Sequence, residues 1–247
     1  MAGKKYLLLV LILLPALLIL SCRKTTKASD ATVEEIIVNI DKDYQYVPKG
    51  RPLGLSVNQT RAVGLNVKSH ETLAKEPGYG PSQVLYGYIT LGNSDDPNIS
   101  FAVDSSGSEG WVIYVDTNNN EDLTDDGPPH ANEGSGKLAA LISLNVEVIS
   151  TSGEKITRPY QLWFWLSQSG SPKFYTRCHY RTQISLGSEQ YTAIAYEKKN
   201  HDALYQESGL WIDINRDGEL NEAQEHFQDG AIIRVNRSQY VLRLKYP

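Results

Sequence analysis

One short segment, residues 213–222, has the residue types and spacing that bind a hard divalent cation. Oxygen-bearing side chains alternate along its first half, and Gly218 follows them. Calcium takes about six to eight oxygen ligands, and a glycine lets the chain turn sharply around the ion. The candidate ligands are Asp213, Asn215, Asp217, Glu219, through its main-chain carbonyl, and Glu222. The sequence therefore predicts a calcium site in this loop.

A weaker copy of the same pattern lies at residues 116–126. Its candidate ligands are Asp116, Asn118, Asn120, Asp122 and Asp125. Glu121 stands where the other segment has its glycine, so we expect Asn119 or Asn120 to adopt the left-handed conformation. The alternative for both loops is an Asp/Asn-rich turn that caps its own backbone without an ion. Repulsion among so many carboxylates favours a bound cation.

The D-x-N-x-D-G-x-L pattern at residues 213–220 resembles the first part of EF-hand and dockerin-type calcium loops. Gln224 stands at the twelfth position, where EF-hands have a bidentate glutamate, so Glu222 or Glu225 would have to serve. A strand-like run, residues 210–212, enters the loop in place of a helix. The resemblance thus implies a calcium loop on a β protein and not an EF-hand domain.

The N-terminus has the pattern of an export signal. Lys4 and Lys5 precede an apolar run at residues 6–20, and Ser21 precedes Cys22. This arrangement resembles the lipobox of bacterial lipoproteins, which implies cleavage of residues 1–21 and lipidation of Cys22. The alternative is an uncleaved anchor helix; either way the rest of the chain lies beyond the inner membrane.

Further expectations about location follow from that resemblance. Residues 22–32 would be a lipidated tether in the bacterial cell envelope, because acyl chains anchor a protein stably. The residue after the lipidated cysteine is Arg23 and not the Asp that resembles an inner-membrane retention signal. The outer membrane is therefore favoured over the inner membrane.

Beyond the tether, the chain has many short runs rich in β-branched and aromatic residues, separated by Gly, Asn, Asp and Ser. The predicted strands are residues 33–40, 63–68, 84–91, 99–103, 111–115, 138–149, 160–166, 175–186, 191–196, 210–214, 231–235 and 240–245. Long helical stripes are missing outside the signal. The predicted class is all-β.

An internal repeat refines this prediction. Residues 89–92 match residues 184–187, and residues 114–118 match residues 211–215. We expect a duplication over about residues 62–247, with an N-terminal module at 33–150 and a C-terminal module at 151–247. The segments 64–68 and 160–166 would open the two halves, which would pack as sheets of a sandwich because each is too small to bury its own core. The expected fold is duplicated β-sandwich-like modules with acidic metal-binding loops.

Other candidates for chemistry are few. The net charge of −5 and the lack of a basic stripe exclude nucleic acid as a partner. No catalytic motif is present, so no catalytic residue is assigned. Cys178 lies in a strand-like run and is expected to be a buried, inert thiol. Trp163 and Trp165 share one face of a predicted strand, where they pack in the core or, alternatively, stack on a sugar.

Two functions remain open at this level. The favoured one is a lipid-anchored, calcium-binding β-repeat protein that acts as a binding or envelope-assembly module with a glycan or protein partner. The alternative is a carbohydrate-binding or sugar-processing component of the envelope. Because carboxylates in a repeated D-x-N pattern suit metal ligands better than an acid–base pair, the alternative ranks second. A fainter resemblance, to uncharacterised lipoproteins that precede thioredoxin-like domains, carries no redox activity because the chain has no CxxC.

Overall fold

The structure, a computed structural model, describes residues 33–40, 44–56, 59–107 and 110–246. These residues form strands and a single turn of 3-10 helix, which confirms the all-β prediction. The predicted signal, Cys22 and the tether lie outside the described residues. Within the described part of the chain, no helix has the length and apolar character needed to cross a membrane.

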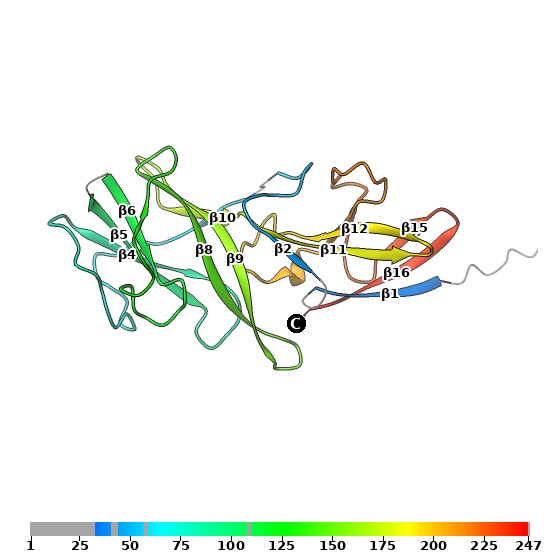
Figure 1. Ribbon diagram of the computed structural model, residues 1–247, viewed down its shortest axis with the longest axis horizontal. Helices are drawn as coiled ribbons and strands as arrows, with labels where there is room; N and C mark the ends of the chain where they lie inside the picture. Colours follow the sequence, from blue (N-terminus) through cyan, green and yellow to red (C-terminus); the bar gives the residue numbers. More distant parts are fainter. Residues whose placement is uncertain (1–32, 41–43, 57–58, 108–109, 247) are drawn as a thin grey trace, which may run out of the picture. The chain divides into compact units, whose positions relative to one another are not determined.

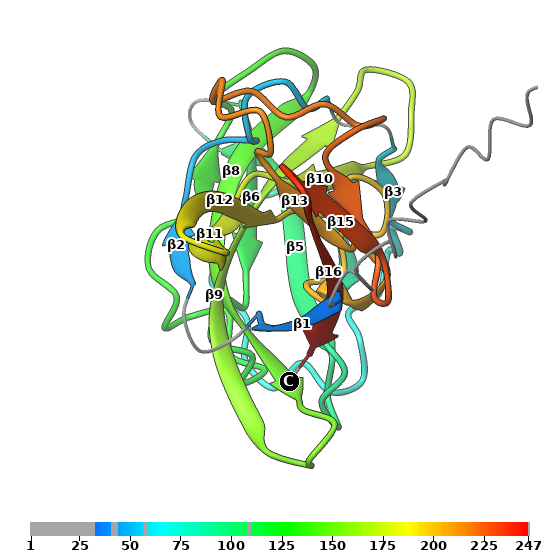
Figure 2. The same cartoon turned by 90° about the vertical axis from the view of Figure 1, so that its right-hand side faces the viewer.

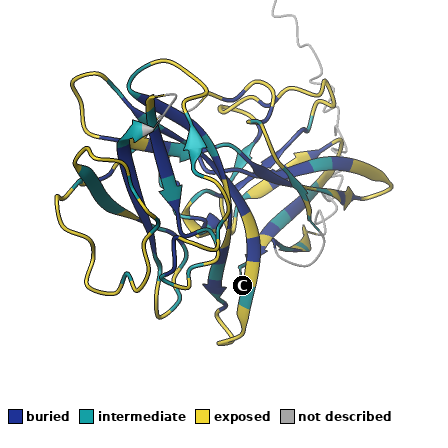
Figure 3. Ribbon diagram, turned by 60° about the vertical axis from the view of Figure 1, so that its left-hand side comes forward, coloured by how far each residue is buried: buried dark blue, intermediate teal, exposed yellow. Residues whose placement is uncertain are grey.

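The strands alternate with turns and loops along the described chain, and many of these connections are exposed (Figures 1 and 3). Their bounds are β1 Val33–Asn39, β2 Gln45–Val47, β3 Arg61–Ala62, β4 Val84–Thr90, β5 Asn98–Gly107, β6 Gly110–Val115, β7 His130–Ala131, β8 Leu138–Ile149, β9 Lys155–Leu166, β10 Lys173–Thr176, β11 His179–Leu186, β12 Glu189–Ala195, β13 Leu210–Ile212, β14 His226–Phe227, β15 Ile232–Val235 and β16 Ser238–Lys245. The 3-10 turn η1 covers Tyr205–Glu207.

A first module consists of two sheets. One is the antiparallel meander β4-β5-β6-β7, and the other has the order β3-β10-β9-β8 with the long hairpin β8–β9 at its edge (Figure 2). The two sheets share one hydrophobic cluster, in which Phe101 of β5 and Phe164 of β9 meet edge to face with ring centroids 5.3 Å apart. Alternation of inward apolar residues along these strands builds a sandwich core.

A second module has the same succession of elements. One of its sheets has the order β14-β13-β12-β11-β2, in which β11 to β14 form the meander and β2 is added at the edge. Its hairpin β15–β16 is extended by β1, which pairs with β16 in parallel. Leu210 and Ile212 from the meander pack with Leu242 from the hairpin in a separate cluster. In both modules, a four-strand meander is therefore followed by a hairpin that covers it.

This arrangement corrects the expectation that the two halves pack as the two sheets of one sandwich. Each module has two sheets and buries its own core, because the hairpin that follows each meander supplies the second layer. The expected boundary at residues 150/151 falls in the turn between β8 and β9. The segment 160–166, expected to open the second half, is instead part of β9 and pairs with β8.

Two predicted strands also differ from the structure. The run 175–186 is divided into β10 and β11 because Arg177 and Cys178 lie between a strand that pairs with β9 and a strand that pairs with β12. The run 63–68 forms no strand, and it contacts β4 through a single bridge between Asn66 and Tyr86.

The modules differ in two of the connections between their meander strands. Seven residues, 91–97, connect β4 to β5, whereas Gly187 and Ser188 alone connect β11 to β12. Conversely, β6 begins at Gly110 soon after β5 ends at Gly107, whereas residues 196–209 separate β12 from β13. The second module thus has an insertion immediately before β13, the strand that leads into its acidic loop.

Candidate metal centre

The two acidic loops occupy equivalent places in the two modules. Each leaves the third strand of its meander, β6 or β13, and leads into the short fourth strand, β7 or β14. At the start of each loop the aspartate main chain is held by the preceding strand. Asp116 N donates to Ser100 O at 2.9 Å, and Asp213 N donates to Thr192 O at 3.0 Å.

The backbone of the two loops follows the same path. Asn119 and Arg216 have φ of 57° and 62°, and two residues later Glu121 and Gly218 have φ of 64° and 83°. Asn119 is left-handed as expected, but so is its counterpart Arg216, and Glu121 itself takes the conformation of Gly218. A side chain in that conformation costs about 1–2 kcal/mol, so the first loop carries strain that the glycine avoids in the second.

Asp213 is the distinctive residue of the second loop. It is 8 % exposed, and its Oδ2 accepts a hydrogen bond from Gly218 N at 3.1 Å. Its Oδ1 is buried and has no hydrogen-bond partner among the described residues. A buried carboxylate oxygen without a partner is costly, and a cation is a natural partner for it.

Asn215 and Asp217 are exposed and hold the outer turn of the loop. Asn215 Oδ1 accepts from Asp217 N at 2.9 Å, and Asn215 Nδ2 donates to Asp217 Oδ2 at 2.8 Å. Asp217 Oδ1 accepts from Glu219 N at 2.8 Å. These side chains are therefore close together on the surface, on the same loop as Asp213.

The two acidic residues at the end of the loop face different partners. Glu225, 2 % exposed, accepts from Ile214 N at 3.0 Å and Asn215 N at 3.2 Å through Oε1, and from Asn221 N at 2.8 Å through Oε2. Glu222 forms an ion pair with Lys198. Of the two residues considered for closing the loop, Glu225 is the one bonded to its backbone.

In the first loop, Asp116 is satisfied by its own backbone. It is fully buried, and its two oxygens accept from Asn120 N at 2.9 Å and Glu121 N at 2.7 Å. Burial raises the pKa of the Asp116 carboxyl, and these two hydrogen bonds oppose that rise. Unlike Asp213, Asp116 has no oxygen left without a hydrogen bond.

The remaining predicted ligands of the first loop are drawn to other partners. The amides of Asn118 and Asn120 donate to Asp125 at 3.4 and 2.8 Å. Asp122 pairs with Lys75, and this hydrogen bond, with those from Thr124, lowers the pKa of Asp122 to about 2. Pairing with a lysine reduces the repulsion among carboxylates, which weakens the expectation of an ion in this loop.

Asp126 was not among the predicted ligands, yet it has the same role in the first loop as Glu225 in the second. Asp126 Oδ1 accepts from Thr117 N at 2.8 Å, and Thr117 follows Asp116 as Ile214 follows Asp213. Asp126 Oδ2 and Asn119 Oδ1 are buried without partners. Asp126 lies ten positions after Asp116, whereas Glu225 lies twelve positions after Asp213. An alignment of the two loops position by position therefore does not pair Asp126 with Glu225.

The fit of these loops to calcium can be judged from the donor sets. No three Asp, Glu, His or Cys side chains converge on a point suited to an ion anywhere in residues 33–40, 44–56, 59–107 and 110–246. A calcium loop also uses amide and main-chain oxygens as ligands, in addition to carboxylates. Both loops have buried oxygens without a hydrogen-bond partner, on Asp126 and Asn119 in the first and on Asp213 in the second. The second loop fits calcium better because its unpartnered oxygen belongs to the first aspartate of the pattern and because Gly218 makes its turn without strain.

The other residues singled out by sequence lie apart from the acidic loops. Trp163 and Trp165 lie on β9, and both are partly covered by the loop before β8, where Ser135 O accepts from Trp165 Nε1 at 3.1 Å. Cys178 is fully buried, and burial raises the pKa of its thiol to about 12. A thiol in that state is a poor nucleophile at neutral pH.

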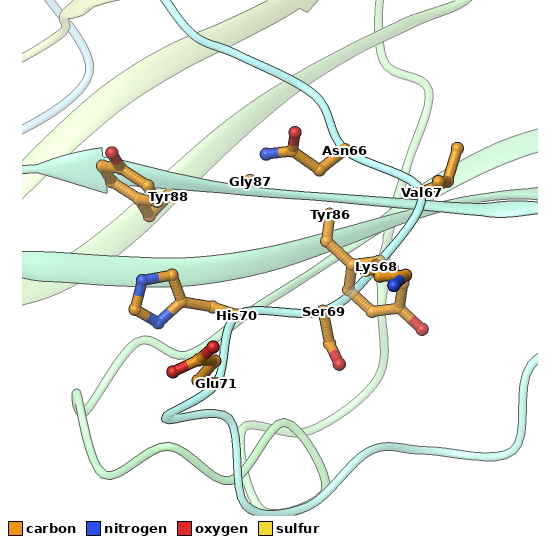
Figure 4. A pocket seen from close by; sticks show the side chains of 9 residues that line it. All are labelled: Asn66, Val67, Lys68, Ser69, His70, Glu71, Tyr86, Gly87 and Tyr88. Carbon is orange, nitrogen blue, oxygen red and sulfur yellow. The ribbon is translucent and has the colours of Figure 1, made fainter.

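A cavity of about 460 Å³ lies beside the edge strand β4 (Figure 4). Its walls are residues 66–71 and Tyr86, Gly87 and Tyr88 of β4. The Tyr88 ring is met edge-on by His70 at 5.6 Å between centroids, and Tyr88 is 43 % exposed. Sequence reasoning missed this cavity because its two sides come from a loop and a strand with no shared motif.

Comparison with known proteins adds no relative. No protein family, curated protein or solved structure matches this chain.

Proposed function

We propose that this protein is a calcium-binding β-repeat protein whose ion site is the loop between β13 and β14. The observation that supports it most is the buried, unpartnered Oδ1 of Asp213 beside a left-handed Gly218. Asp213, Asn215 and Asp217 would supply side-chain oxygens, and Glu219 its carbonyl oxygen. Glu225, bonded to the loop backbone, would add negative charge beside the ion.

Calcium in this site would be structural. The loop connects two neighbouring strands of the second meander, so an ion would fix their connection and the adjacent surface. No catalytic step is assigned to the ion, and the protein would act as a binding or assembly module.

Isothermal titration calorimetry with calcium, and with magnesium for comparison, tests this proposal. We expect calcium binding that Asp213→Ala removes and that Asp95→Asn, a change to an exposed carboxylate of the β4–β5 turn, leaves unchanged. If Asp213→Ala still shows heat of calcium binding, the ion binds at another site.

We also propose that the protein is lipid-anchored through Cys22 in the bacterial cell envelope, the outer membrane being favoured. The support is the order of a basic start, an apolar run and Ser21 before Cys22. Mass spectrometry of the protein purified from membranes should find a diacylglyceryl group on Cys22. A Cys22→Ser variant should lose that mass, and an unmodified Cys22 in the wild type would contradict the proposal.

A second candidate function is carbohydrate binding at the β4 cavity. Tyr88 presents an exposed aromatic face there, with polar groups of Asn66 and Ser69 along the same cavity. Glycan-array binding that is lost in Tyr88→Ala and retained in Trp165→Ala would support this site. The reverse pattern would favour the β9 tryptophans as the sugar site. If no glycan binds, the carbohydrate-binding function is ruled out and only the calcium-binding function is left.

A further inference from the structure

The insertion of the second module lines a small cavity. Residues 196–209 separate β12 from β13, and six of them line a cavity of about 290 Å³ together with residues of β13 and of the acidic loop that include Trp211 and Glu222. The volume is at the small end of the roughly 300–1,000 Å³ that ligand sites occupy. The cavity therefore suits a small ligand.

Charges of both signs line this small space. Lys198 and Lys199 contribute positive charge, and Glu207 and Glu222 contribute negative charge. Lys198 is almost buried, with its side chain 7 % exposed, while its partner Glu222 is 56 % exposed. Asn200 Nδ2 orients Glu207 by donating to its Oε2 at 3.0 Å. A ligand with one charge would match half of these groups, whereas a zwitterion would match both halves.

Two buried donors in the lining have no partner. Trp211 Nε1 and Tyr196 Oη are both buried without a hydrogen bond among the described residues. Trp211 is 1 % exposed and is held by stacking on His226, with ring centroids 4.1 Å apart. A buried donor left unpaired costs about 1–3 kcal/mol, and a ligand acceptor would satisfy it.

The same packing argues against a sugar in this cavity. His226 covers one face of the Trp211 ring, and Lys198 Nζ lies 5.5 Å from its centroid. His226 is fixed in turn because its Nε2 donates to Ser208 O at 2.7 Å. Since Trp211 is almost fully buried, it offers no open face for a sugar ring.

We propose that this cavity binds a free amino acid, with the ligand carboxylate at Lys198 and Lys199 and the ligand ammonium at Glu207 and Glu222. The site is independent of calcium binding, although Glu222 belongs to the neighbouring acidic loop. Binding is expected both in EDTA and in calcium, so failure of one proposal does not decide the other.

Isothermal titration calorimetry with a set of free amino acids tests the site. Each active amino acid is then compared with its N-acetyl and its amide derivative. Losing a charged hydrogen bond weakens binding by about tenfold or more, so blocking either end should have that effect. Lys198→Met and Glu207→Gln should cause similar losses. Lys155→Met, which removes an exposed lysine paired with Glu147 in the first module, should have none.

Three results would overturn the proposal, provided that circular dichroism shows both variants folded. The first is no heat from any free amino acid at up to about 10 mM, beyond the millimolar range of weak binding. The second is equal affinity for free and end-blocked ligands. The third is unchanged affinity in both Lys198→Met and Glu207→Gln. If Lys198→Met does not fold, the affinities of the end-blocked ligands and of Glu207→Gln decide whether the proposal holds.

Discussion

At the scale of single residues, the two loop aspartates differ although their sequences align. Asp116 uses both oxygens to accept main-chain hydrogen bonds, whereas Asp213 uses one and has a buried oxygen without a partner. Asp116 therefore only caps the backbone of its loop, whereas Asp213 caps the backbone with one oxygen and keeps the other available for a cation. The sequence pattern predicts both as ligands because it cannot show which oxygens the backbone already satisfies.

Isosteric variants should separate these two roles. Asp116→Asn places an amide donor against a backbone N–H, so it should lower the free energy of unfolding by about 1–3 kcal/mol without calcium. Asp213→Asn can keep its bond to Gly218 N and should change stability in EDTA much less. Urea unfolding in EDTA measures both, and equal losses would contradict the distinction.

A buried acid between the modules should make stability depend on pH. Glu197 is fully buried, and its Oε2 accepts from Tyr160 Oη at 2.7 Å and from Thr176 Oγ1 at 3.1 Å. Burial, with a contribution from Asp202, raises the pKa of Glu197 from 4.5 to about 8. Between these values the folded state holds a proton that the unfolded state has released, so stability falls as pH rises.

Chemical unfolding of the wild type and Glu197→Gln from pH 5 to pH 8 tests this effect. Glu197 should contribute a fall in the unfolding free energy of up to about 1.4 kcal/mol per pH unit. Glu197→Gln, which stays neutral, should show a shallower fall. Parallel pH profiles for the two proteins would show that Glu197 is ionised in the folded state.

At the scale of elements, strands of several residues were predictable and the shortest strands were not. The apolar alternation of β8 predicts its full length, residues 138–149. Strands β3, β7 and β14 have two residues each, which is too short to show an alternation of apolar and polar residues. Only their hydrogen bonds to neighbouring strands define them. The end of β10 was missed because the next residues, Arg177 and Cys178, look strand-like while the chain changes sheet.

The glycines that follow β4 and β11 should differ in how much they tolerate a side chain. Gly92 and Gly187 have φ of 73° and 67°, but a Cβ at Gly92 would lie 2.2 Å from Glu147 O on β8. At Gly187 the nearest atom would be the Tyr240 hydroxyl, at 2.9 Å. The first position is thus restricted by both backbone strain and a main-chain clash.

Gly187→Ala should cost about 1–2 kcal/mol of unfolding free energy from strain. Gly92→Ala should cost about 1–3 kcal/mol more, because β8 must also shift. Differential scanning calorimetry of the two variants measures the difference. Equal losses would mean that the turn after β4 does not pack against β8 as described.

At the scale of the whole described chain, repeated motifs predicted a duplication but not how each copy builds a core. The matched segments lie in the meanders, and the hairpins that complete the two sandwiches share no motif. The contacts joining the modules were also hidden from sequence. They include Arg158 Nη1 to Ala203 O at 3.4 Å and Gly92 N to Asp202 O at 2.6 Å.

The buried contacts between the modules predict that both unfold together. Phe164→Ala opens a cavity in the first core and Leu242→Ala in the second, and each should cost about 2–5 kcal/mol. Either variant should lower the midpoint of one common transition in calorimetry. A biphasic melt in which each variant moves only one phase would show that the modules unfold independently.

We propose above all that the second acidic loop is a structural calcium site. The most direct measurement is a thermal melt of the purified protein in EDTA, in calcium and in magnesium, for the wild type and for Asp213→Asn. Binding to the folded state stabilises by about 2.7 kcal/mol at a hundredfold excess over Kd, so calcium should raise the wild-type melting temperature by several degrees. Magnesium should do much less, and Asp213→Asn should lose the calcium response. A wild-type melting temperature that is the same in all three conditions would contradict the account and leave the acidic loops as turns that cap their own backbone.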